Sequence, residues 1–230
     1  MKQKAATIYK LTDMNMKTYR GYPWTLGKWN RTSGKGNLCG PGWLHAYTSP
    51  VLAELLNPIH ANFREYRLFR GEASGPVISD SGLKVGYTNM RITEELPRLH
   101  ITTENRIRFG IACACRVCTS AEYRAWAERW VSGADRTKAA VRTAIRAARA
   151  AGATGWATEV AAAAGWATFG YRPVIWATEV AAEAAAEAAG WAATEAAEAA
   201  AEAAVGLPLC DLAAWAVGND DLTAIKRMSI

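Results

Sequence analysis

Short apolar runs separated by turn-forming residues dominate the first 131 residues, a pattern that is typical of short strands. Ile8–Leu11 predicts a first strand, and polar Asp13–Asn15 a turn after it. The segment Arg106–Cys113 is apolar without clean alternation, so it fits either a strand or the start of a helix. The other expected strands are Trp43–Tyr47, Tyr66–Ala73 (ending at Gly75-Pro76), Val77–Ile78, Lys84–Gly86 and Met90–Ile92.

Three helices are predicted in the first 151 residues. Ser49 suits an N-cap and Pro50 the first helical position, and Asn57-Pro58 ends this helix. Ala121–Val131 carries aromatic residues three to four positions apart on one face. Asp135 is a candidate cap for the next helix, which is expected to run to about Ala151.

Alanine dominates from about residue 134 to residue 204, and a word of the form Trp-Ala-Thr-Glu-Val recurs there. The repeats are spaced in multiples of five residues, which does not match the roughly 3.6 residues of a helical turn. We therefore expect tryptophans 156, 166, 176 and 191 not to line one face of a helix. A helix over 174–205 carries only acidic charges, whereas the helix over 136–149 is basic. We expect the two to pair antiparallel, the alternative being that the acidic helix docks a partner. Leu209–Val217 and Asp220–Met228 predict two short helices.

These patterns predict two parts. Residues 1–131 form an α+β domain with a small curved sheet, and residues 132–230 form an alanine-rich helical hairpin or bundle with short C-terminal helices. Alanine buries little apolar area per residue, so this arm needs close helix packing, which favours homo-oligomerisation or partner contact.

The net charge of +6 is concentrated in the first part, where residues 1–131 carry 19 Lys/Arg against 10 Asp/Glu. Such an excess favours an anionic ligand, although solubility alone explains it equally well. Nucleic acid is possible but not favoured, because no recognised nucleic-acid-binding motif is present. The polar start and the interrupted alanine tracts predict no signal peptide, no membrane contact and a cytoplasmic location.

The five cysteines do not form a complete metal motif. Cys113, Cys115 and Cys118 lack a fourth nearby ligand of the kind that zinc requires, so we interpret them as buried thiols. No P-loop, dinucleotide fingerprint or nucleophile elbow occurs, and we predict neither a metal nor a cofactor.

Two groups of side chains have the chemistry of a binding site. His45 and Tyr47 lie two residues apart on an expected strand and share a face, where they suit a base, a phosphate or acid–base work, or simply a hydrogen-bonded pair. Trp24 and Trp29, with Arg20 and neighbouring cations, suit either a stacking wall for a nucleotide or an apolar plug.

The segment from Leu38 to Ala53 contains the sequence motif Gly-Trp-Leu-His-Ala-Tyr at residues 42–47. With Tyr9-Lys10, Trp24, Arg67-Leu-Phe and Lys84-Val-Gly, it resembles an uncharacterised domain family of bacteriophage and bacterial proteins that often carry Ala/Trp-rich tails. The resemblance covers about the first 130 residues and implies a phage-type origin without a settled activity. The candidate ligand-binding residues are Tyr9, Lys10, Arg20, Trp24, His45, Tyr47, Ser49 and Lys84.

The order of these words also resembles the ADP-ribosyltransferase fold, with Ile8–Thr12, Gly40–Ala46, Ser49–Ala53 and Leu68–Gly75 as the matching segments. That resemblance implies NAD as substrate. Two positions depart from it, since Lys10 stands where a histidine would hold the ribose and Leu44 replaces a tyrosine. The required glutamate is not identified.

These observations favour a phage accessory protein, expected in the host cytoplasm, that binds a nucleotide-like anion or a host protein and counters a host defence. A transferase that uses NAD and a non-specific nucleic-acid binder are the alternatives. Catalysis is not assigned to any residue.

Overall fold

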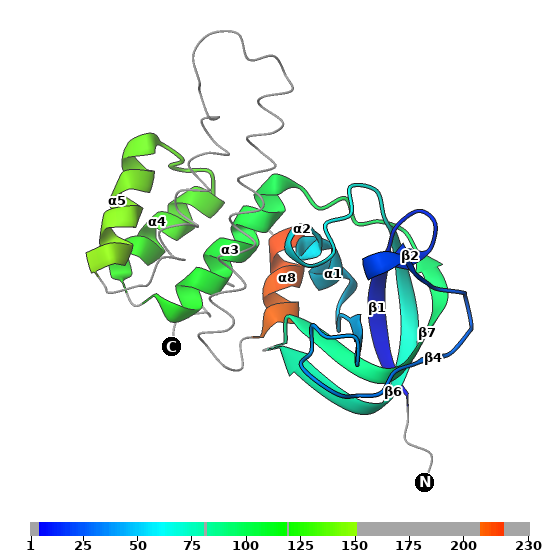
Figure 1. Cartoon of the computed structure of the whole chain (residues 1–230). Coiled ribbons are helices and arrows are strands. Elements are labelled where there is room, and N and C mark those ends of the chain that lie inside the picture. The colour runs from blue at the N-terminus through cyan, green and yellow to red at the C-terminus, as the bar shows by residue number, and fades with distance from the viewer. Residues whose placement is uncertain (1–4, 81, 119, 151–207, 219–230) are drawn as a thin grey trace. The chain divides into compact units, whose positions relative to one another are not determined.

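The computed structural model describes residues 5–80, 82–118, 120–150 and 208–218. The chain divides into two compact units, residues 1–100 and 101–230 (Figure 1). The first unit is a mixed sheet-and-helix domain and the described part of the second is helical, so the predicted α+β class is confirmed. The helix over 174–205, its antiparallel pairing, the tryptophan repeats and the 220–228 helix all lie outside the described residues.

An antiparallel sheet forms the centre of the first unit. Its strand order is β1-β6-β7-β4, with β5 also paired to β7. The strands are β1 (Ala6–Thr12), β4 (Asn30–Arg31), β5 (Leu44–Ala46), β6 (Arg67–Asp80) and β7 (Lys84–Leu96). Tyr47, directly after β5, exchanges backbone hydrogen bonds of 2.8 and 2.9 Å with Tyr9 of β1. The sheet therefore curves until the segment after β5 meets β1.

Two long strands replace four of the short strands expected from the sequence. The prediction that Gly75-Pro76 ends a strand is wrong, because β6 continues through it to Asp80. A shift in the pairing register between Ser74 and Val77 accommodates the extra residues as a bulge, and Gly75 has a φ of +82° there. The expected strands at 84–86 and 90–92 are likewise parts of β7.

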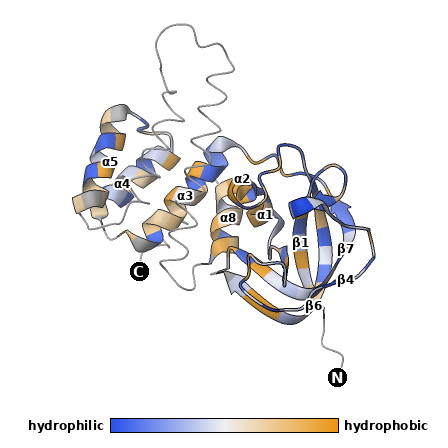
Figure 2. Ribbon diagram, in the orientation of Figure 1, coloured by the Kyte–Doolittle hydropathy of each residue, from blue (hydrophilic) through white to orange (hydrophobic). Residues whose placement is uncertain are grey.

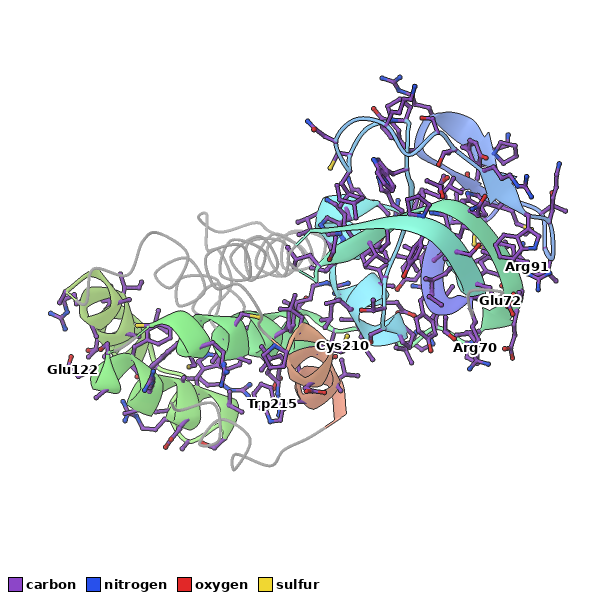
Figure 3. The ribbon with its side chains drawn as sticks, turned by 90° about the horizontal axis from the view of Figure 1, so that it is seen from below. Arg70, Glu72, Arg91, Glu122, Cys210 and Trp215 are labelled. Atoms are coloured by element: carbon purple, nitrogen blue, oxygen red, sulfur yellow. The ribbon has the colours of Figure 1, made fainter. Side chains whose placement is uncertain are left out.

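Alternation along β6 and β7 separates a buried face from a charged one (Figure 2). Phe69, Met90 and Ile92 face the core with Ile8. On the opposite face the strands are joined by ion pairs, and Arg70, Glu72 and Arg91 are seen together there (Figure 3). The pairs on that face are Arg70–Glu94 at 2.8 Å and Arg91–Glu72 at 2.6 Å. A third pair, Arg67–Glu95 at 2.5 Å, lies on the side of Phe69, which is the cross-strand partner of Glu95.

Helices α1 (Pro50–Leu55) and α2 (Asn57–His60) follow β5, and the predicted cap of α1 is confirmed. The Ser49 hydroxyl accepts a hydrogen bond from the Leu52 amide at 3.4 Å. A short hairpin precedes β5, built from β2 (Lys17–Thr18), the 3-10 turn η1 (Tyr19–Gly21) and β3 (Tyr22–Pro23).

The described part of the second unit contains four helices: α3 (Thr103–Val117), α4 (Ala121–Val131), α5 (Lys138–Ala150) and α8 (Leu209–Gly218). The strand alternative for Arg106–Cys113 is wrong, because this segment lies within α3. The predicted α4 is confirmed to the residue. Thr137, and not the expected Asp135, caps α5, because its hydroxyl accepts a hydrogen bond from the Ala140 amide at 3.3 Å.

The boundary between the two compact units differs from the boundary at residue 131 that the change in composition predicts. The compact units meet at residues 100 and 101, whereas alanine enrichment begins after residue 131. The difference arises because α3 packs against α4 and α8, and α4 packs against α5. Across the described residues, no helix is both long and apolar enough to cross a membrane.

Candidate functional site

Lys10 is a buried cation on the apolar side of β1. It lies two residues after Ile8 and so on the same face of the strand, and its side chain enters the core and is only 7% exposed. Its Nζ donates a hydrogen bond of 2.5 Å to the carbonyl oxygen of His45 and lies 4.6 Å from the centroid of the Trp24 ring. Burial lowers the pKa of the Lys10 amine from 10.5 to about 7, because the charged form loses its hydration.

Trp24 supports this amine from inside the domain. The indole is buried in the same core as Ile8 and Phe69, and its Nε1 donates to the Thr18 hydroxyl at 3.0 Å. Its ring face provides a cation–π contact to Lys10. Trp24 and Trp29 therefore do not form one exposed wall: Trp29 is exposed, and the Arg91 guanidinium lies 4.9 Å from its ring.

His45 is half-buried on β5 and is surrounded by positive groups. Its Nε2 hydrogen-bonds to the carbonyl oxygen of Leu38. Burial is the main cause that lowers the pKa of His45, and the Leu38 hydrogen bond opposes it. The charges of Lys10, Lys84 and His60 lower the pKa further. Each charged group that acts on His45 is thus basic.

Tyr47 and His60 form a stacked pair beside His45. The Tyr47 hydroxyl and His60 Nδ1 are 3.2 Å apart, and the ring centroids are 5.8 Å apart with an angle of 18° between the planes. Tyr47 is buried and His60, the last residue of α2, is half-buried. Sequence reasoning missed His60, because nothing local to it signals that α2 returns beside the segment after β5.

Six of the eight candidate residues lie in this region and two do not. The backbone of Tyr9 forms a β-bridge with that of Tyr47. The charge of Lys84, at the start of β7, lowers the pKa of His45. Arg20 is exposed, has a φ of +58°, and stacks its guanidinium 5.2 Å from the Tyr19 ring. Ser49 is engaged in capping α1. The basic cluster, named so from here on, consists of Lys10, His45, His60 and Lys84.

A buried carboxylate, Glu54 on α1, has a structural role in the same domain. It is 0% exposed and accepts hydrogen bonds from the Tyr66 hydroxyl at 2.8 Å and the Leu99 amide at 2.9 Å. Burial, followed by the hydrogen bond and charge of Glu54, raises the pKa of Tyr66 to about 12. Glu54 therefore ties α1 to the chain that follows β7 and is not directed toward a substrate.

The cysteine segment in the second unit is buried, as predicted. Cys113, Cys115 and Cys118 are at most 2% exposed on or just after α3. Burial, reinforced by Cys118, raises the pKa of the Cys115 thiol to about 12, and burial also raises that of Cys113. A neutral thiol is a poor nucleophile, so this segment behaves as core.

Comparison with known proteins finds one family that the first unit resembles. A search of curated proteins found no match to this chain, and neither did a search of solved structures, so the ADP-ribosyltransferase resemblance gains no support. Residues 6–104 match the family described as Domain of unknown function (DUF7666), which contains the whole sheet and the basic cluster. The N-terminal part of the chain is therefore similar to a domain family of unknown function, which agrees with the uncharacterised family that the sequence predicted.

Proposed function

We propose that the N-terminal domain binds a small phosphate-bearing anion, such as a nucleotide, at the basic cluster. The observation that carries the proposal is the environment of His45, where the charged groups of the described residues that act on it, Lys10, Lys84 and His60, are all basic. Like charges held together in a partly buried region repel one another. An anion placed among them relieves that repulsion and forms charge-assisted hydrogen bonds.

The exposures of the four side chains suit this role. His45, His60 and Lys84 are half-buried, so each presents part of its surface to solvent. Lys10 lies deeper and is fixed by the His45 carbonyl and the Trp24 ring. We therefore assign direct contact with the ligand to the three half-buried groups, and a supporting charge to Lys10.

The biological setting stays a prediction from the resemblance to phage proteins. An accessory role in a phage, countering a host defence in the host cytoplasm, agrees with a ligand-binding domain but is independent of the geometry. Contact with a host protein and homo-oligomerisation through the alanine-rich arm also stay predictions.

A transferase that uses NAD also stays a prediction, with less support. It needs a carboxylate aimed at the ribose, and the buried Glu54 is bound to Tyr66 and Leu99. Labelled NAD incubated with the protein and a host lysate tests it directly, because transfer of label to a macromolecule requires catalysis.

Calorimetric titration of the full chain with ADP and with inorganic phosphate, at pH 8, tests the binding proposal. Repeating it in buffers of different ionisation enthalpy measures the protons taken up on binding. A bound anion favours the charged amine, so we expect uptake of up to about one proton per ligand. Lys10→Met should weaken binding at least about ten-fold and reduce this uptake, because the buried charge is removed.

Two further variants make this result decisive. His60→Gln changes a half-buried member of the cluster and should also weaken binding. Arg142→Gln removes an exposed charge of the second unit and should leave binding unchanged. Failure of both probes to bind, or equal affinity in Lys10→Met, His60→Gln and the native chain, overturns the proposal.

A further inference from the structure

A long stretch of the first unit carries positive charge only. Residues 14–53 contain no Asp or Glu but five Lys or Arg. The structure exposes all five of these side chains, which are Lys17, Arg20, Lys28, Arg31 and Lys35. Because no acidic residue of the same stretch neutralises them, this surface is suited to a polyanion.

Large apolar side chains are exposed along the same stretch. Seven large hydrophobic residues are exposed in the described parts of the chain, and five of them lie between residues 14 and 29. They are Met14 (55%), Tyr19 (78%), Tyr22 (39%), Leu26 (54%) and Trp29 (37%). Exposed large apolar side chains that are concentrated in one short segment of a chain indicate a contact surface.

The backbone that presents these rings is held in place. The Asp13 carboxylate accepts hydrogen bonds from the amides of Asn15 and Lys17, which fixes the turn before β2. The Gly27 amide donates to the Ile92 carbonyl at 2.7 Å, and β4 pairs with β7. A rigid display reduces the conformational entropy that binding costs.

Cations and rings alternate on this surface. The Arg20 guanidinium lies 5.2 Å from the Tyr19 ring. The Arg91 guanidinium lies 4.9 Å from the Trp29 ring, although Arg91 also pairs with Glu72. Flat rings with flanking cations match a ligand that carries both planar groups and phosphates, because bases stack on rings and phosphates bind cations.

We propose that the exposed side chains of residues 14–35, here called the basic aromatic surface, bind single-stranded nucleic acid. A single strand offers unpaired base faces and a phosphate at each step, whereas a duplex hides its base faces and an acidic peptide has few planar groups. This inference is independent of the small-anion site, because it uses none of Lys10, His45, His60 and Lys84.

Fluorescence anisotropy of the full chain tests this surface. The probes are labelled twelve-nucleotide strands, oligo-dT and oligo-U, and a twelve-base-pair duplex. Tyr19→Ala and Trp29→Ala should each weaken single-strand binding by about 5-fold to about 100-fold, the usual effect of losing one base–ring stack. Arg20→Gln with Lys28→Gln should reduce the slope of log K against log salt by about 1.4.

Matched controls remove similar groups elsewhere. Val77→Ala shortens an exposed apolar residue on β6, and Arg142→Gln with Arg146→Gln removes two exposed charges of α5. These variants and Lys10→Met should retain single-strand affinity, so this test and that of the small-anion site fail separately. The ratio of oligo-dT to oligo-U affinity then identifies DNA or RNA as the better ligand.

Three results overturn the inference: no binding of either strand, equal affinity for strand and duplex, or equal affinity in Tyr19→Ala, Trp29→Ala and the native chain. Competition by polyglutamate as effective as that by unlabelled strand also overturns it, since it indicates an acidic protein as the partner.

Discussion

Burial shifts the pKa of a buried amine in the first unit and of a buried thiol in the second unit in opposite directions. In the first unit burial lowers the pKa of Lys10 to about 7, close to neutrality. In the second unit burial raises the pKa of the Cys115 thiol to about 12, far from neutrality. The cause is the same, because a low-dielectric surrounding disfavours the charged form of an acid and of a base alike.

This difference shows where chemistry is available at neutral pH. The second unit holds the thiols of Cys113 and Cys115 and the Tyr123 phenol neutral, because burial raises the pKa of all three. The first unit holds an amine that is readily charged or discharged, next to two histidines. Small changes around Lys10, such as an arriving anion, therefore alter its protonation, whereas the thiols stay inert.

The largest expected effect is on the stability of the first unit. Because the folded-state pKa of Lys10 is below its unfolded value, the unfolded chain binds more protons between pH 7 and pH 10.5. The free energy of unfolding should therefore rise with pH through this window. Lys10→Met should lack this rise, which is on the order of 4–5 kcal/mol over the whole window and about 3 kcal/mol up to pH 9.5, at about 1.4 kcal/mol per pKa unit.

Urea unfolding of the native chain and of Lys10→Met at several values of pH between 6 and 9.5 measures this difference. The range ends below pH 10 because Tyr66, whose pKa is raised to about 12, destabilises the folded state above the ordinary pKa of tyrosine. Parallel pH profiles for the two proteins contradict the buried-amine account.

The second effect concerns the thiols. At pH 8.5 the fraction of Cys115 present as thiolate should be about a thousand-fold lower in the folded protein than in the unfolded one, from the rise of its pKa from 9.0 to about 12. Iodoacetamide should label Cys115 only after unfolding in urea, as read by mass spectrometry of peptides. Exposed Cys39 serves as the internal control that reacts in the folded state. Labelling of Cys115 at equal rates in both states refutes its burial.

The third and smallest effect is the loss of stability when the buried carboxylate of Glu54 is removed from its hydrogen-bond donors. Glu54→Ala removes the acceptor of the Tyr66 hydroxyl and the Leu99 amide, so it should cost about 2–4 kcal/mol of stability. Tyr66→Phe removes one of these bonds and should cost about half as much. A loss below about 1 kcal/mol in Glu54→Ala means that Glu54 is not anchored in this way, and thermal unfolding distinguishes the two results.

Local signals explain which parts of the fold the sequence predicts. The Ser49-Pro50 cap and the aromatic face of Ala121–Val131 are written in consecutive residues, and both helices form as expected. The continuity of β6 through Gly75-Pro76 depends on pairing with β7. Strand pairing is a long-range property that the local sequence does not reveal. The hydrogen bonds between β6 and β7 on both sides of Gly75-Pro76 outweigh the tendency of these two residues to end a strand.

The same distinction applies to the site. The sequence predicts that His45 and Tyr47 share a face, because they are two residues apart on one expected strand. Lys10 follows Ile8 by two residues on β1, which is consistent with its position next to the core. The contribution of His60 and the burial of Trp24 arise from contacts between segments distant in sequence. Arg20 was selected for its charge near tryptophans, and the left-handed turn that directs it onto Tyr19 has no clear signal in the sequence.

The most direct test of the account is an NMR titration of the Lys10 side chain, followed through its ε-carbon and assigned with Lys10→Met. We predict a midpoint near pH 7 without ligand, and a higher midpoint with saturating ADP or phosphate, because a bound anion favours the charged amine. A midpoint near 10.5 without ligand, or one that neither anion changes, contradicts the account.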